Sequence, residues 1–202
     1  MKKLYTILFS VIVIFFCTSC GKDLNENGSR EDNQNEKDEQ LDGPYENQDE
    51  LMEQFVQSIL DSTYTLYYIP YFNPEAITPL LEYADDFSPV YYFPQSGLSS
   101  YYLHDKKLGE CLLWTIECIR VRYPFKDNLH QFVSSIPLLV DKKFLEDVLT
   151  IPGVDRLDYR LNDQQLHEVY EVYRKWWESY NHENFEEIRK INLLENLNYV
   201  WL

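Results

Sequence analysis

From residue 49 onward, apolar residues recur at the three- and four-residue spacing of an α-helix. Leu51, Phe55 and Ile59 share one face of residues 49–62, which predicts a first amphipathic helix. Loops and helix breakers divide the rest of the chain into further segments with the same spacing. The pattern therefore indicates a helical protein.

A second helix is predicted over residues 73–84. Asn73 suits the N-cap position, and Pro74 suits the first helical position. Pro79 lies inside the segment and cannot donate a backbone hydrogen bond, so it predicts a kink or an early helix start.

Residues 108–122 are apolar on nearly every side, and a helix of that kind belongs in the middle of a domain. We therefore predict that this segment is the core helix. Glu110, Glu117 and Arg120 lie within it. Because an unpaired buried charge is costly, these three residues should lie at the helix edges or find partners.

The strongest local signal begins at Asn162. Asn162 and Gln165 form a capping-box pair, and apolar or aromatic residues follow at helical spacing through residue 180. This pattern predicts a long amphipathic helix over residues 162–180.

Three shorter helices and a tail complete the pattern. Helices are predicted at residues 129–136, at residues 141–149 with Asp141 as the cap, and around Phe185. The apolar residues 199–202 are expected to pack back onto the domain.

Tyrosine is concentrated in two segments without helical spacing. Residues 63–72 could form a strand or an aromatic loop, and residues 85–107 contain prolines and a glycine that favour a long ordered loop. Tyrosine rings can stack on sugars, anchor a protein partner or simply cover the core. The candidate ligand-contact residues are Tyr67, Tyr71, Tyr91, Tyr92 and Tyr101.

Together these elements predict an all-α fold, a single compact domain over residues 49–202 whose helix pairs could stack, with long aromatic-rich loops. Cys111 and Cys118 would lie about 10.5 Å apart along the core helix, beyond the roughly 7 Å that a disulfide allows between Cα atoms. They are expected to be free, buried thiols.

The N-terminus carries a different pattern. Lys2 and Lys3 precede residues 4–16, an apolar run of about 13 residues that is shorter than the roughly 20 of a membrane-spanning helix. A basic start, a short apolar run and small residues before a cut are typical of a secretory signal peptide, here residues 1–19.

Thr18, Ser19 and Cys20 resemble the lipobox of a bacterial lipoprotein, although Cys17 stands where leucine is usual. The resemblance implies that Cys20 is lipidated and becomes the new N-terminus, so that its acyl chains hold the protein on the membrane. Modification of Cys17 instead would put the bulky Phe16 at the cleavage position, where a small residue is needed, so we expect Cys20 to be the modified residue. The alternative is an ordinary cleaved signal with a free cysteine.

Residues 20–48 follow as the lipidated cysteine and a polar, acidic stretch with almost nothing to bury, which predicts a disordered tether. Lys22 and Asp23 resemble the export signal that sends Bacteroidetes lipoproteins to the outer face of the outer membrane. We therefore expect an outer-membrane lipoprotein that could face the cell surface. The alternative is that these two residues only begin a polar linker.

The net charge excludes one class of partner. The formal charge is −16, and removal of residues 1–19 takes away Lys2 and Lys3 and makes it −18. A chain this acidic repels nucleic acid, so no nucleic-acid partner is expected.

No catalytic or cofactor motif stands out. His167 and His182, each followed by glutamate, begin like the zinc-protease helix motif, but each lacks the second histidine. Ser99 and His104 lie in a loop without the nucleophile-elbow pattern. The sequence therefore predicts no catalytic residue, no metal site and no cofactor.

Residues 108–120, the lipobox and the closing residues 198–202 resemble uncharacterised lipoproteins of gut Bacteroidetes, a family that implies no active site. We expect a lipid-anchored cell-envelope protein whose domain is a non-enzymatic binding or accessory module for a glycan or an envelope protein. Two alternatives stay open. The protein could be a hydrolase of an envelope or dietary polymer that uses acidic residues, or a purely structural lipoprotein.

Overall fold

The computed structural model describes residues 48–66, 68–94, 106–124, 134, 136–180 and 183–202, all within the compact unit Gln40–Leu202. The helices are α1 (Gln48–Leu60), α2 (Ile77–Tyr83), α3 (Leu108–Arg122), α4 (Lys143–Thr150), α5 (Asp163–Trp177) and α6 (Phe185–Ile188), with the 3-10 turns η1 (Pro74–Ala76) and η2 (Arg156–Tyr159). Two antiparallel pairs of short strands join β1 (Pro89–Val90) to β2 (Lys106–Lys107) and β3 (Leu139–Asp141) to β4 (Tyr199–Trp201). The predicted mainly helical fold is confirmed.

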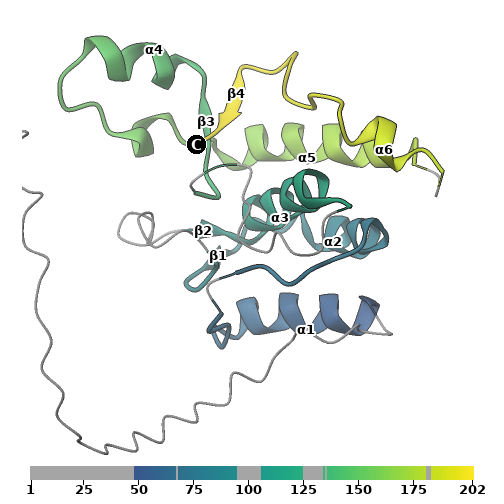
Figure 1. Cartoon of the computed structure of the whole chain (residues 1–202). Coiled ribbons are helices and arrows are strands. Elements are labelled where there is room, and N and C mark those ends of the chain that lie inside the picture. The colour runs from purple at the N-terminus through teal and green to yellow at the C-terminus, as the bar shows by residue number, and fades with distance from the viewer. Residues whose placement is uncertain (1–47, 67, 95–105, 125–133, 135, 181–182) are drawn as a thin grey trace, which may run out of the picture. The chain divides into compact units, whose positions relative to one another are not determined.

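The central element is α3. Figure 1 shows α2 and α3 between α1 on one side and α5 on the other, and α3 packs directly on both α2 and α5. Every residue of α3 except Val121 is buried. The predicted core helix is therefore confirmed, and so are the free buried thiols of Cys111 and Cys118.

The charged residues of α3 are buried with partners. The Oε2 atom of Glu110 lies 2.9 Å from Nη2 of Arg160, and its Oε1 atom accepts the N–H of Leu139 at 2.7 Å. Glu117 and Arg120 form an ion pair with each other. The expectation that these groups would find partners is confirmed, and the Glu110 contacts tie α3 to β3 and to the segment before α5.

The predicted helix over residues 73–84 is divided in two. The 3-10 turn η1 comes first, and α2 follows it directly. Pro79 therefore lies in the first turn of α2, where a backbone N–H has no partner within the helix, and proline costs little there.

Gly109 allows α2 and α3 to approach closely. A Cβ atom at this position would lie 2.2 Å from the carbonyl oxygen of Ala84. The N–H of Gly109 also donates to the carbonyl of Asp86 at 2.7 Å. A larger residue would have to push the backbone after α2 away from α3.

The capping box of α5 forms as predicted. The side-chain oxygen of Asn162 accepts the N–H of Gln165 at 3.0 Å, and the side-chain oxygen of Gln165 accepts the N–H of Asn162 at 3.0 Å. Both bonds satisfy donors that the first turn of a helix leaves without partners.

The C-terminal tail packs back onto the domain, as expected, and does so as a strand. β4 pairs with β3 so that Val200 lies opposite Val140. The backbone bonds continue outward, with Leu202 accepting from Ile136 at 3.0 Å and Asn198 accepting from Lys142 at 2.9 Å.

Other predicted segments have mixed outcomes. The described residues of 63–72 are irregular, which decides between the two alternatives in favour of a loop. Residues 129–133 and 135 of the predicted helix at 129–136 lie outside the described residues, and the described Ser134 and Ile136 are not helical. No described helix has the length and apolar character needed to cross a membrane.

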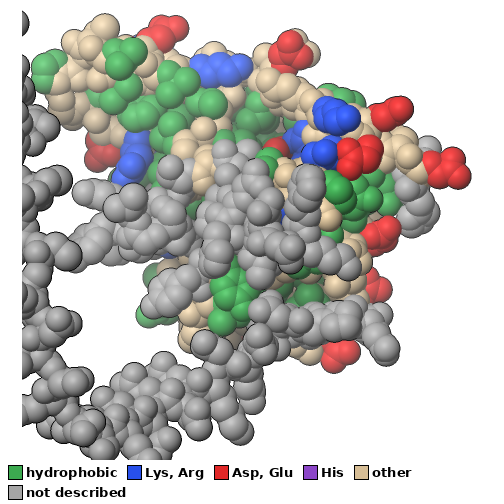
Figure 2. Space-filling model, in the orientation of Figure 1, with side chains coloured by type: hydrophobic (Ala, Val, Ile, Leu, Met, Phe, Trp, Pro, Cys, Tyr) green, Lys and Arg blue, Asp and Glu red, His purple; other side chains and the backbone are tan. Residues whose placement is uncertain are grey.

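The predicted helix at residues 141–149 is α4, and it buries none of its residues. The N-cap of α4 is Lys142, not Asp141 as predicted, because Asp141 is the last residue of β3. The side chain of Asp141 nevertheless accepts the N–H of Lys143 at 2.8 Å. Leu149 is 85% exposed, and Leu145 and Val148 are also exposed. Figure 2 shows hydrophobic side chains gathered over this part of the molecule.

Candidate functional site

The predicted tyrosine candidates are only partly described. Tyr91 and Tyr92 follow β1 and are 67% and 59% exposed, whereas Tyr71 is half-buried. Tyr67 and Tyr101 lie outside the described residues, as does Cys20. The exposed pair Tyr91 and Tyr92 therefore stays a candidate contact, and a common cluster of all five rings stays a prediction.

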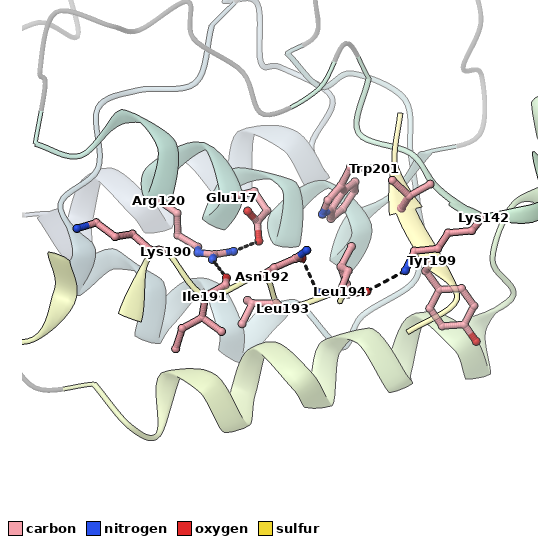
Figure 3. Close-up of a pocket in the computed structure, with 11 residues that line it drawn as sticks. Glu117, Arg120, Lys142, Lys190, Ile191, Asn192, Leu193, Leu194, Tyr199 and Trp201 are labelled. Carbon is pink, nitrogen blue, oxygen red and sulfur yellow. Dashed lines mark hydrogen bonds and ion pairs between the residues drawn. The ribbon is translucent and has the colours of Figure 1, made fainter. Parts of the chain in front are cut away.

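A concave site lies elsewhere, where the C-terminal segment crosses α3. It is a pocket of about 410 Å³, within the size range of small-molecule sites in proteins. Figure 3 shows that its walls come from the second half of α3, the segment after α6, β4 and the residue after β3. We call it the C-terminal pocket, and its lining residues are Glu117, Arg120, Lys142, Lys190, Ile191, Asn192, Leu193, Leu194, Tyr199, Val200 and Trp201.

Arg120 fixes one end of the segment that follows α6. Its guanidinium donates to the carbonyl of Arg189 at 2.8 Å and to the carbonyl of Ile191, and it pairs with Glu117. The guanidinium also lies 5.0 Å from the ring centre of Trp176, close enough for a cation–π contact. These contacts hold the floor of the C-terminal pocket in place.

Lys142 fixes the other end of the same segment. Its ammonium group donates to the carbonyls of Leu194 and Leu197. Lys142 follows β3 directly, so the pairing of β3 with β4 places this cation at the pocket wall. Two cations therefore hold the C-terminal segment by its backbone carbonyls.

The aromatic wall is fixed by a buried hydrogen-bond chain. The indole N–H of Trp201 donates to the hydroxyl of Tyr173 at 3.1 Å, and that hydroxyl donates to Glu117 at 2.5 Å. Burial raises the pKa of Tyr173 well above its ordinary value, and the charge of Glu117 adds to the rise. The hydroxyl therefore stays protonated and keeps donating to Glu117.

The chemistry of the C-terminal pocket is that of a binding site. Among the described residues, Glu117 is the one carboxylate that lines it, and Arg120 and Tyr173 already engage this group. The remaining lining combines cations, the amide of Asn192, aliphatic side chains and two aromatic rings. Such a mixture of apolar walls and a few polar groups is typical of pockets that bind small ligands.

The histidine that suggested a metal has another role. Nδ1 of His167 lies 2.6 Å from Oδ1 of Asp85, and Asp163, one helical turn before His167, pairs with Lys107. Within the described part of the chain, no group of three or more potential metal ligands gathers. His182, Ser99 and His104 lie outside the described residues.

Sequence reasoning did not find the C-terminal pocket. It named Arg120 only as a charge in need of a partner and residues 199–202 only as an apolar tail. Lys142 and Lys190 were not singled out, because cations scattered along a chain carry no local pattern. The one usable signal is that Arg120 lies in a mostly apolar helix, so that its guanidinium needs hydrogen-bond acceptors.

The fold and the site together define a class of protein, a mainly helical domain whose C-terminal segment closes a cation-lined pocket over a core helix. The chain belongs to the family described as a domain of unknown function (DUF4943), which matches residues 45–202. The comparisons with curated proteins and with solved structures gave no match.

Proposed function

We propose that the protein is a lipid-anchored cell-envelope protein whose helical domain binds a glycan in the C-terminal pocket. The anchor would be the acylated Cys20 at the outer membrane, with residues 21–48 as the tether between lipid and domain. The lipobox resemblance and the acidic linker support this half of the proposal.

The observation that carries the binding half is the composition of the pocket wall. Trp201 and Tyr199 supply aromatic rings, Asn192 supplies an amide, and Lys142 and Lys190 supply donors. Sugars present flat apolar faces edged by hydroxyl groups, so they need this combination of stacking surface and hydrogen-bond donors.

The hydrogen-bond partners of Glu117 favour a binding site over a hydrolytic site. A glycosidase of the usual kind places two carboxyl groups on either side of the bond that it cleaves. The described lining of the C-terminal pocket offers one, Glu117, and its Oε1 atom accepts hydrogen bonds from both Arg120 and Tyr173. A carboxylate engaged in this way stabilises the wall and is poorly placed to transfer a proton to a substrate.

Two isoleucines allow a matched test of the site. Ile191 lines the C-terminal pocket and is 50% exposed, whereas Ile151 follows α4 and is 49% exposed. We expect Ile191→Trp to fill the pocket and lower the affinity of the complete, detergent-purified chain for oligosaccharides in a calorimetric titration. Ile151→Trp should leave the affinity unchanged. Equal affinities for both variants, or no binding by the parent chain, would overturn the proposed site.

The anchor is tested separately in cells. Cys20→Ala should move the protein from the membrane fraction to the soluble fraction, and protease added to intact cells should remove the domain if it faces outward. Retention of the Cys20→Ala chain in the membrane fraction would contradict the anchor.

A further inference from the structure

The C-terminal pocket has an unusual charge for this protein. Its described lining contains three cations, Arg120, Lys142 and Lys190, against the single carboxylate of Glu117. The formal charge of the whole chain is −16. A positive pocket in so acidic a protein is a local feature that the overall composition does not explain.

The cations are spread along the C-terminal pocket. Figure 3 shows Lys190 at one end and Lys142 at the other, with Arg120 between them. They come from three places in the chain, α3, the residue after β3 and the segment after α6. Any ligand that lies along the pocket would meet positive charge at more than one point.

Most of this positive charge is not cancelled by the protein. The ammonium of Lys142 is hydrogen-bonded to two backbone carbonyls, which are neutral, and a lysine has three donors to offer. Neither Lys142 nor Lys190 has an ion pair with a described carboxylate. Arg120 is balanced by Glu117, so the two lysines give the pocket its net positive charge.

We propose that the C-terminal pocket is specific for an acidic glycan, a sugar chain that carries carboxylate groups. This inference rests on the proposed function and adds the ligand's charge to it. Lys190, which is exposed at the rim, would pair with one carboxylate, and Lys142 would attract a second group at the far end. Arg120 is buried and its guanidinium is already bonded to Glu117 and two backbone carbonyls, so it contributes mainly by holding the pocket wall in place.

The pocket wall favours a sugar over an acidic peptide. Trp201 of the strand β4 lies between the two lysines, so a ring held between the charges would face its indole ring. Peptide carboxylates sit on flexible side chains and need no such surface. An acidic peptide is therefore treated as a competing outcome of the test.

The test uses a charge reversal with a matched control. Lys190→Glu and Lys143→Glu change the net charge of the chain by the same amount, but Lys143 lies on α4, its side chain is 69% exposed and it does not line the pocket. Each complete chain, purified in detergent, is titrated calorimetrically with three probes. The probes are a short galacturonic acid oligosaccharide, the same oligosaccharide with its carboxyl groups reduced to alcohols, and an oligoglutamate peptide.

We expect the parent chain to bind the acidic oligosaccharide more tightly than the reduced one. Lys190→Glu should weaken binding of the acidic probe by about three- to tenfold, because an exposed ion pair is worth up to about fivefold in affinity and reversal adds repulsion. Lys143→Glu should have no such effect, and Lys190→Arg should bind like the parent. Unchanged melting of Lys190→Glu would show that the loss is not a loss of fold.

The remaining outcomes separate the two proposals. Equal binding of the acidic and the reduced oligosaccharide would overturn the charge specificity and leave the glycan site standing. Binding of oligoglutamate alone would overturn the glycan class. No binding of any sugar would overturn the proposed function, and the inference would fall with it.

Discussion

Two helices of this protein, α3 and α4, differ in almost every respect except their content of apolar residues. α3 is buried along its whole length, charges included, whereas α4 buries no residue. The difference comes from their neighbours. α2 and α5 cover α3, while α4 is held mainly by η2. Apolar content therefore indicates only that a helix can be buried. Whether it is buried depends on the elements that pack around it.

The contacts of α4 show how an exposed helix is kept in place. The hydroxyl of Tyr159 donates to Asp147 at 2.7 Å, and the ring of Tyr159 packs on that of Phe144 at 5.6 Å. Both contacts lie on one side of α4. Leu145, Val148 and Leu149 of the same helix stay exposed.

The largest effect is expected at Glu110. Glu110→Ala takes away the buried carboxylate to which Arg160 and the N–H of Leu139 are bonded, and loss of one partner of a buried ion pair costs about 3–5 kcal/mol. Glu146→Ala on α4 should change the free energy of unfolding by less than about 0.5 kcal/mol. Urea denaturation of both variants measures the difference, and similar losses would mean that the Glu110 pair is not buried as described.

A leucine pair tests the comparison through packing alone. Leu112 on α3 is fully buried, and Leu149 on α4 is 85% exposed. Leu112→Ala should cost about 2–5 kcal/mol of unfolding free energy, because it leaves a cavity. Leu149→Ala should stay within about 0.5 kcal/mol. If Leu149→Ala proved equally costly, α4 would have to be covered in solution.

A smaller effect is expected at the start of α4. Asp141 accepts the N–H of Lys143 and the side-chain N–H of Asn198, so Asp141→Ala removes a hydrogen bond to the first turn of α4 and a link to the C-terminal segment. Loss of a hydrogen bond of this kind costs about 1 kcal/mol. Asp141→Asn, which keeps an acceptor, should recover most of the loss in thermal denaturation, and a failure to recover would assign the effect to charge.

The smallest effect is expected at the surface pair of His167 and Asp85. The hydrogen bond to Asp85 is the main reason that the pKa of His167 is raised above its ordinary 6.5, and the charge of Glu171 adds less. The stabilisation is fully present below pH 6.5 and is lost as the pH rises through the raised pKa. In an NMR titration, Asp85→Asn should return the pKa of His167 towards 6.5, and Glu171→Gln should lower it less. An unchanged pKa in Asp85→Asn would contradict the pairing.

The sequence predicted the parts of the fold that local patterns encode. The apolar character of residues 108–122 identified the core helix, and Asn162 with Gln165 identified the start of α5. The strands β3 and β4 are only three residues long and leave no alternating pattern to recognise. Helical spacing likewise identified the apolar face of α4 but carries no information on what covers it.

The C-terminal pocket could not be predicted because its residues are far apart in the sequence. Its cations, Arg120, Lys142 and Lys190, are brought together by the β3–β4 pairing and by carbonyls of the segment after α6. Those contacts join residues more than 50 positions apart. The predicted lipid anchor at Cys20, by contrast, rests on adjacent residues that form a local motif. It stays a prediction that the cell experiment tests.

The most direct measurement follows the indole N–H signals of the complete chain in a two-dimensional NMR titration with the galacturonic acid oligosaccharide. The chain has four tryptophans, of which Trp201 lines the C-terminal pocket and Trp114 is fully buried in α3. Ligand binding at the proposed site should shift the Trp201 signal, assigned with Trp201→Phe, and leave that of Trp114 in place. Binding that leaves Trp201 unshifted would contradict the proposed site.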